Sequence, residues 1–225
     1  MPRCPGHIFV MWVTCVKQCG RPTSRATAAG HQRARSYSER VAIRKDRTTQ
    51  RLAEFAHVIV RSGYLNRAHA LMEVGNAARA ELDDDAGVDD LADQLVDDAE
   101  AELAHEQLSW PDRTDNDALR EVRTELADQG FLVLEYCADH FDPTAELKAR
   151  PGAAGLVFFT ESDAWGAITD RVLQLSVRRA DASAAGSGDP EVASVLESMR
   201  RHGLDASFKK GRVSVPMVWR RREML

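Results

Sequence analysis

The sequence predicts an α+β fold in which a helical N-terminal half packs on a small sheet of four or five strands, mixed or antiparallel. Apolar residues recur with the 3.6-residue period of helices through residues 45–108. Beyond Gly130 the period changes to two, which is typical of strands. The chain has 225 residues, of which 44% are hydrophobic, so it is long enough for one ordinary domain. We therefore expect a single domain over 41–225, with a helical part at 45–108 and a strand-rich part at 109–222.

The first 40 residues are predicted to be a disordered basic extension. Residues 1–50 hold ten Lys or Arg and two acids, and residues 20–38 are small and polar without an apolar period. The apolar run 8–16 is too short to span a bilayer, and no convincing signal-peptide cleavage site follows it. Three of the four cysteines lie in this extension, which fits a reducing cytoplasm better than a disulfide framework. A cytoplasmic location without membrane insertion is predicted.

Three helices are expected in the N-terminal half. The first starts near Lys45 and ends at Gly63, because glycine suits the left-handed end of a helix. Asn66 can cap the second, and the third covers residues 88–108 with a stripe of leucines. Twelve acids and no Lys or Arg occur in 81–106, so packing of the leucines must stabilise the third helix against like-charge repulsion. Its acidic face is a candidate surface for a protein partner.

The C-terminal half alternates helices with short strands. One helix follows Thr114 and ends at Gly130, a short one lies around 163–170, and another follows Asp189. Strands are predicted at 131–137, 156–160, 173–177, 206–209 and 212–219. Because Pro216 lacks a backbone donor, the last strand is expected at an edge of the sheet or with a bulge. An exposed edge can accept a strand from a protein partner.

The most distinctive sequence element is the octet Trp110–Asp117, which reads Trp-Pro-Asp-Arg-Thr-Asp-Asn-Asp. Thr114 and Asp117 have the spacing of a capping box, so the octet can simply begin a helix. Asp115, Asn116 and Asp117 also offer the oxygen atoms of a cation or polar-ligand site. This turn alone supplies too few cation ligands and lacks the EF-hand spacing. We favour the interpretation of the octet as a helix start, and a role in binding a cation or polar ligand remains the alternative.

A second polar cluster follows the first predicted strand and contains Cys137, Asp139, His140 and Asp142. A Cys–His nucleophilic pair would need a hydrogen bond between the two side chains and a third orienting group. For structural zinc, two soft ligands are too few, and the cysteines of the extension lack a Cys-x-x-Cys knuckle. We expect no metal and no cofactor. The candidate catalytic or ligand-binding residues are Asp115, Asp117, Cys137 and His140.

Basic residues are numerous near the end of the chain, among them Arg178–Arg179, Arg200–Arg201 and Arg220–Arg222. No helix-turn-helix, RNA-recognition or zinc-finger pattern accompanies them, so a solvated rim is favoured over a nucleic-acid surface. The signature motifs of P-loop and dinucleotide-binding proteins, serine hydrolases and zinc proteases are also absent. The commonest enzyme classes are therefore not expected.

Five sequence elements point to a family. They are Val60–Tyr64, Trp110–Asp117, Leu119–Gly130, Gly155–Phe159 and Val218–Arg222, and they span residues 45–222 approximately. Through them the chain resembles an uncharacterised domain family found mainly in actinobacteria, and the octet is the most specific of the five. The resemblance implies a cysteine-rich segment after the first strand, where this chain has Cys137 alone. Any metal or redox capacity of that segment is therefore expected to be lost here, and the resemblance implies no activity.

These observations favour a non-enzymatic protein-interaction or regulatory module. Its contact surface would be the acidic helix 88–108 or the edge strand 212–219. The alternative is a small enzyme or a ligand- or metal-binding domain that uses the polar candidates near Asp115, Asp117, Cys137 and His140. That alternative requires these four side chains to converge in one pocket.

Overall fold

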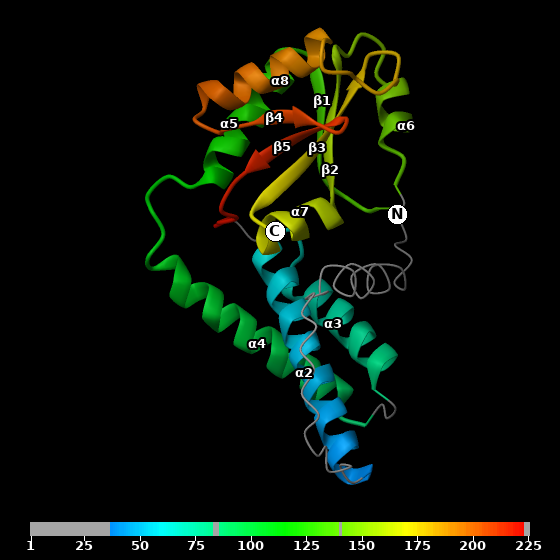
Figure 1. Ribbon diagram of the computed structural model, residues 1–225, viewed down its shortest axis with the longest axis vertical. Coiled ribbons are helices and arrows are strands. Elements are labelled where there is room, and N and C mark those ends of the chain that lie inside the picture. Colours follow the sequence, from blue (N-terminus) through cyan, green and yellow to red (C-terminus); the bar gives the residue numbers. More distant parts are fainter. Residues whose placement is uncertain (1–36, 83–85, 140, 223–225) are drawn as a thin grey trace, which may run out of the picture. The chain divides into compact units, whose positions relative to one another are not determined.

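The computed structural model describes residues 37–82, 86–139 and 141–222, with side chains described from residue 46. These residues form seven helices and five strands (Figure 1). In chain order they are α2 (Tyr37–Ser62), α3 (Arg67–Glu81), α4 (Val88–Gln107), α5 (Asp115–Asp128), β1 (Phe131–Cys137), α6 (Pro143–Lys148), β2 (Gly155–Thr160), α7 (Glu161–Thr169), β3 (Val172–Arg179), α8 (Pro190–Arg201), β4 (Ser207–Lys209) and β5 (Arg212–Pro216). The predicted α+β fold is confirmed. Of the predicted extension, residues 1–36 lie outside the described residues.

The chain divides into two compact units. The first contains the chain up to His57 together with Arg67–Ala99, and the second contains Val58–Asn66 and everything from Glu100 onward. In the first unit, buried apolar residues come from all three helices and include Phe55, Val74 and Val96. Across the described ranges, no helix is both long enough and apolar enough to cross a membrane.

Arginines of α3 bind the acidic face of α4 within the first unit. Arg79 donates to Asp89 at 2.5 Å, while Arg67 lies 2.6 Å from Asp97 and 3.6 Å from Asp93. All of these side chains are largely exposed, so each pair stabilises the helix pair by well under about 1 kcal/mol. The pairs nevertheless reduce the like-charge repulsion expected along this helix.

The second unit is built on a five-stranded mixed sheet of order β1-β2-β3-β5-β4. Strands β1 and β2 run parallel, and the other neighbours run antiparallel. Helices α5 and α8 lie on one face of this sheet and α6 lies on the other (Figure 1). Because side chains alternate along a strand, Val133 faces α5 and α8, while Leu132 packs with Leu156 and with Leu147 of α6.

The last two strands form the predicted hairpin, but the prediction of an edge strand at 212–219 is wrong. Lys210 and Gly211 both have positive φ, 53° and 80°, as the tight two-residue turn of a hairpin requires. This turn folds β4 back onto β5, so β4 forms that edge of the sheet. Pro216 is tolerated because the pairing of β4 with β5 reaches only to Ser214, and no described strand pairs with Pro216 on that side.

Candidate functional site

The octet begins α5, as its capping-box spacing predicts. Thr114 Oγ1 accepts a hydrogen bond from the Asp117 N–H at 3.2 Å, and Asp117 Oδ2 accepts one from the Thr114 N–H at 2.9 Å. Arg120 lies 3.1 Å and Arg222 lies 3.2 Å from the same carboxylate. Partial burial opposes ionisation, but the bonds from Thr114 and the two arginines hold the pKa of Asp117 below its usual range. Asp117 is therefore an ionised capping group.

Asp115 and Asn116 bind the backbone of the C-terminal segment, which we define as Met217–Arg222. Asp115 Oδ2 accepts from the Val218 N–H at 2.7 Å, and Asn116 Oδ1 accepts from the Arg220 N–H at 2.5 Å. The partners are 103 and 104 residues apart in the chain. The octet therefore has a second role, which is to hold the C-terminal segment against the start of α5.

Trp219 fixes the middle of the C-terminal segment. Its side chain is only 2% exposed, and its indole N–H donates to the Ser62 carbonyl oxygen at 3.4 Å. The indole also lies 6.2 Å from the Phe159 ring and 6.3 Å from the Tyr64 ring, measured between centroids. Four of the five sequence elements of the family resemblance thus meet at this segment.

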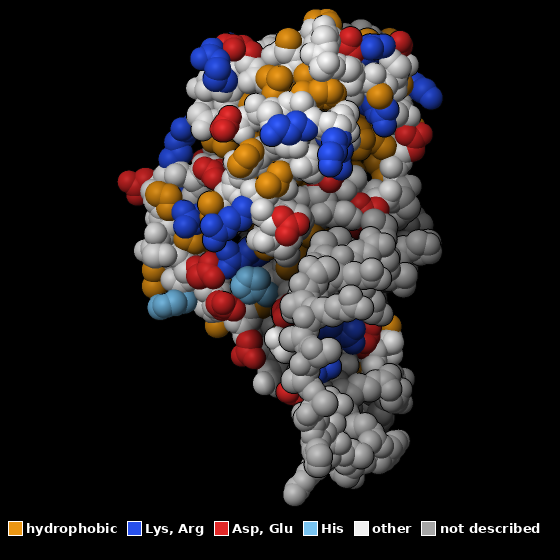
Figure 2. All heavy atoms as spheres, viewed as in Figure 1, with side chains coloured by type: hydrophobic (Ala, Val, Ile, Leu, Met, Phe, Trp, Pro, Cys, Tyr) orange, Lys and Arg blue, Asp and Glu red, His pale blue; other side chains and the backbone are white. Residues whose placement is uncertain are grey.

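A cavity of about 200 Å³ lies where the first turns of α5, the strand β1 and the C-terminal segment come together. We call it the arginine cavity. Its lining consists of Tyr64, Asn116, Asp117, Leu119, Arg120, Arg123, Glu135, Arg221 and Arg222. Figure 2 shows Lys and Arg side chains, interspersed with acids, gathered over the start of α5 and the C-terminal segment. Four of the nine lining residues are arginines, so the cavity is predominantly basic.

The acidic side chains of the arginine cavity are each shared between two arginines. Glu135 lies 3.0 Å from Arg123 and 3.9 Å from Arg221, in addition to the Asp117 pairs given above. The Arg221 side chain is 17% exposed and lies with its Cζ atom 3.9 Å from the centre of the Tyr64 ring. Two carboxylates thus face four guanidinium groups, which leaves the lining with an excess of two positive charges.

Tyr64 is held on every side. One face of its ring stacks on Tyr136 at a centroid distance of 4.5 Å, so Arg221 lies against the opposite face. Its hydroxyl donates to Glu135 at 3.2 Å, and burial together with the Glu135 charge raises the pKa of Tyr64. Tyr136 itself has φ of 53°, in the left-handed region that favours glycine, at an irregularity of β1. The Tyr64 phenol is therefore a protonated, partly buried donor.

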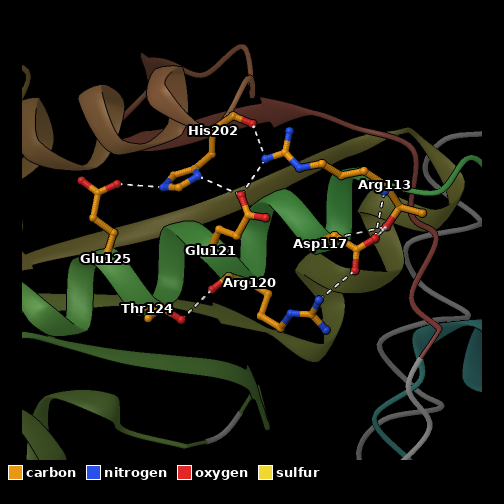
Figure 3. A network of polar contacts seen from close by, with 8 residues as sticks. Arg113, Asp117, Arg120, Glu121, Thr124, Glu125 and His202 are labelled. Atoms are coloured by element: carbon orange, nitrogen blue, oxygen red, sulfur yellow. Dashed lines mark hydrogen bonds and ion pairs between the residues drawn. The ribbon is translucent and has the colours of Figure 1, made fainter.

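Polar contacts also join α5 to the end of α8, and Figure 3 shows them together with Asp117 and Arg120 of the arginine cavity. The His202 ring lies between two carboxylates, with Nδ1 3.0 Å from Glu121 and Nε2 2.8 Å from Glu125. Arg113 donates to Glu121 at 2.7 Å and to the His202 carbonyl oxygen at 3.2 Å. These contacts tie the end of α8 to α5. None of the four residues lines the arginine cavity.

Three of the four candidate residues from the sequence are described by the structure, and these three do not share one pocket. Of Asp115, Asp117 and Cys137, only Asp117 lines the arginine cavity. Cys137 packs against the apolar cluster around Leu132, which faces α6 on the opposite side of the sheet. His140 lies outside the described residues, as do the three cysteines of the extension. Within the described ranges, no group of three or more His, Cys, Asp or Glu side chains could hold a metal ion.

The environment of Cys137 predicts an unreactive thiol. Burial, and secondly the charge of Glu161, raises the pKa of Cys137 to about 11. At pH 7.5 the thiolate is then roughly 300-fold scarcer than for a free cysteine of pKa about 8.5, and its greater nucleophilicity offsets roughly tenfold of this. We expect iodoacetamide to modify Cys137 roughly 30-fold more slowly in the folded chain than in urea, measured peptide by peptide by mass spectrometry. Equal rates in the two states would contradict the raised pKa.

Sequence reasoning missed four residues of the arginine cavity, which are Tyr64, Arg120, Arg123 and Glu135. One signal was present, because Glu135 interrupts the apolar strand Phe131–Cys137 and a carboxylate in such a strand needs a partner. The prediction of a solvated rim also fails for Arg221, which is mostly buried against Tyr64. The sequence around the other three missed residues, Tyr64, Arg120 and Arg123, is typical of any helix face or helix end.

Comparison with known families places this geometry in a wider context. A family model described as Domain of unknown function (DUF6891) matches residues 45–223. The chain belongs to this family. The DUF6891 match covers nearly the span of the resemblance and includes every residue that lines the arginine cavity. No curated protein and no solved structure gives a significant match.

Proposed function

We propose that the chain is a non-enzymatic binding module whose arginine cavity holds a small anionic ligand. The observation that carries the proposal is that four guanidinium groups share two carboxylates in one cavity. Each guanidinium has five N–H donors, and pairing with a carboxylate uses two of them at most. The carboxylates therefore orient guanidinium groups whose N–H donors suit an anion in the cavity. A cytoplasmic site of action, as predicted from the sequence, fits this role.

Two titratable groups of the arginine cavity, Asp117 and Tyr64, suit binding better than acid–base catalysis. An efficient general acid or base has a pKa close to the working pH. Asp117 has a lowered pKa and Tyr64 has a raised one, so neither changes its charge near neutral pH. Arg221 and Arg222 line the cavity and belong to the C-terminal segment. The regulatory role predicted from the sequence is then a response of this segment to the bound anion.

The proposal is tested by titrating the full chain with sodium sulfate at pH 7.5 in an isothermal calorimeter at constant ionic strength. Arg120→Gln and Arg123→Gln each remove one guanidinium from the rim of the cavity. Their side chains are 48% and 42% exposed, so the fold should tolerate both changes. A hydrogen bond to a charged group contributes about 1.5–3 kcal/mol, so we expect sulfate affinity to fall at least about tenfold in each variant.

The matched control is Arg200→Gln, which removes an arginine of α8 that lies outside the arginine cavity. Its side chain is 71% exposed and pairs only with Glu197 among the contacts described. Sulfate affinity should stay within about twofold of the unmodified chain. Equal losses in the control and in the cavity variants would mean a diffuse charge effect, and no binding at all would remove the proposed function.

A protein partner at the acidic helix remains a second prediction. Three carboxylates of α4, those of Asp89, Asp93 and Asp97, pair with arginines of α3. The acidic face therefore has less unbalanced charge for a partner than its sequence indicates. For this reason we place the binding role at the arginine cavity.

A further inference from the structure

The charge and size of the arginine cavity indicate which class of anion it takes. We infer, building on the proposed function, that the ligand is a phosphate monoester whose phosphate group is bound by Arg120, Arg123 and Arg221. Three features of the cavity favour this class of ligand, namely its excess charge, its volume and the way Tyr64 is enclosed.

The excess of two positive charges matches a dianion. A phosphate monoester carries about −1.5 to −2 charges at pH 7, whereas a carboxylate carries one. A monoanion matches only half of the excess charge of the lining. The guanidinium fork also suits the paired oxygen atoms of a phosphate group. A phosphate with three terminal oxygens can engage several arginines at once, which a carboxylate with two oxygens cannot do equally well.

The arginines of the cavity are already oriented for such a ligand. Arg120 and Arg123 are three residues apart on α5 and therefore project from the same side of the helix. Arg221 enters from the C-terminal segment, where the Tyr64 ring and Glu135 fix its guanidinium. Arg222 donates to the backbone carbonyls of Pro111 and Asp112 as well as to Asp117. We assign it to holding the segment in place.

The volume and the aromatic contacts limit recognition to the phosphate group. About 200 Å³ is less than the roughly 300–1,000 Å³ of pockets that enclose drug-sized ligands. Both faces of the Tyr64 ring are covered, by Tyr136 and by Arg221, so Tyr64 offers no surface on which a base or sugar could stack. The remainder of the ester must therefore extend out of the cavity past the half-exposed Arg120 and Arg123.

The test compares methyl phosphate, inorganic phosphate, sulfate and acetate by calorimetry with the full chain, at pH 7.5 and at pH 5.0. Methyl phosphate has its second pKa near 6, so its dianion fraction falls about tenfold between these values, whereas sulfate remains a dianion. The charged or titratable lining groups are Tyr64, Asp117, Glu135 and the four arginines, and no histidine is among them. Sulfate binding measured at both pH values reports any change in the protein itself.

We expect methyl phosphate to bind at pH 7.5 at least tenfold more tightly than acetate, and to lose about tenfold at pH 5.0 while sulfate changes less than twofold. Arg123→Gln should weaken methyl phosphate and sulfate alike. Acetate binding as tightly as sulfate would overturn the dianion assignment and leave the proposed function intact. Binding of inorganic phosphate without methyl phosphate would exclude a monoester. If none of the four anions binds, the proposed function fails together with this inference.

Discussion

Replacing Trp219 with Ala is expected to lower the free energy of unfolding by about 3–5 kcal/mol. The indole is only 2% exposed and fills the space beside the Tyr64 and Phe159 rings. The substitution removes that packing, leaves a void and releases the Ser62 carbonyl oxygen from its indole donor. A loss of this size is a large share of the 5–15 kcal/mol typical of a folded domain. Urea denaturation followed by circular dichroism measures it.

Two further variants separate packing from a general effect on the C-terminal segment. Trp219→Phe retains an aromatic ring and should cost much less than the alanine change. Val218→Ala alters the neighbouring residue, whose side chain is 36% exposed, and should change stability by less than about 0.5 kcal/mol. If Trp219→Ala and Val218→Ala had similar effects, Trp219 would not anchor the segment as its burial indicates. Trp219→Ala should also bind sulfate less well than the unmodified chain, because Arg221 belongs to the segment that Trp219 anchors.

Local signals in the sequence were sufficient for most of the fold. The apolar segment Phe131–Cys137, the Thr114 capping box and the Lys210-Gly211 turn each specify their structure within a few residues, and all three are confirmed. Helix α6 was missed because its six residues are too few to show a helical period. Its start, Asp142 followed by Pro143, has the same cap pattern that identified the start of α8, so the signal was present.

The candidate site was predictable only in part, because its contacts join distant parts of the chain. The octet contains enough to predict a helix start, but nothing near Asp115 or Asn116 indicates that their partners are more than 100 residues away. The arginine cavity likewise combines Tyr64, residues of α5, Glu135 and the C-terminal segment. Helical period and capping describe each part separately, and only the folded sheet brings the parts together.

Gly155→Ala is expected to lower the free energy of unfolding by about 3 kcal/mol, at the upper end of the range for overpacking. Gly155 begins β2 and pairs with Arg179 of β3. A Cβ atom at this position would lie 2.7 Å from the Arg178 carbonyl oxygen and 3.0 Å from Cε1 of Phe131. The carbonyl belongs to the backbone of the neighbouring strand, so it cannot withdraw without disturbing the pairing of β2 with β3.

The same substitution at Gly166 provides the control, because the two glycines differ in what surrounds them. Gly166 lies inside α7, where an added Cβ would come no closer than 3.8 Å to its nearest neighbour, the Val172 carbonyl oxygen. Alanine is about 1 kcal/mol better than glycine within a helix, so Gly166→Ala should stabilise the chain. Urea denaturation of both variants therefore tests opposite signs for one chemical change. A Gly155→Ala variant as stable as the unmodified chain would show that β2 and β3 can move apart.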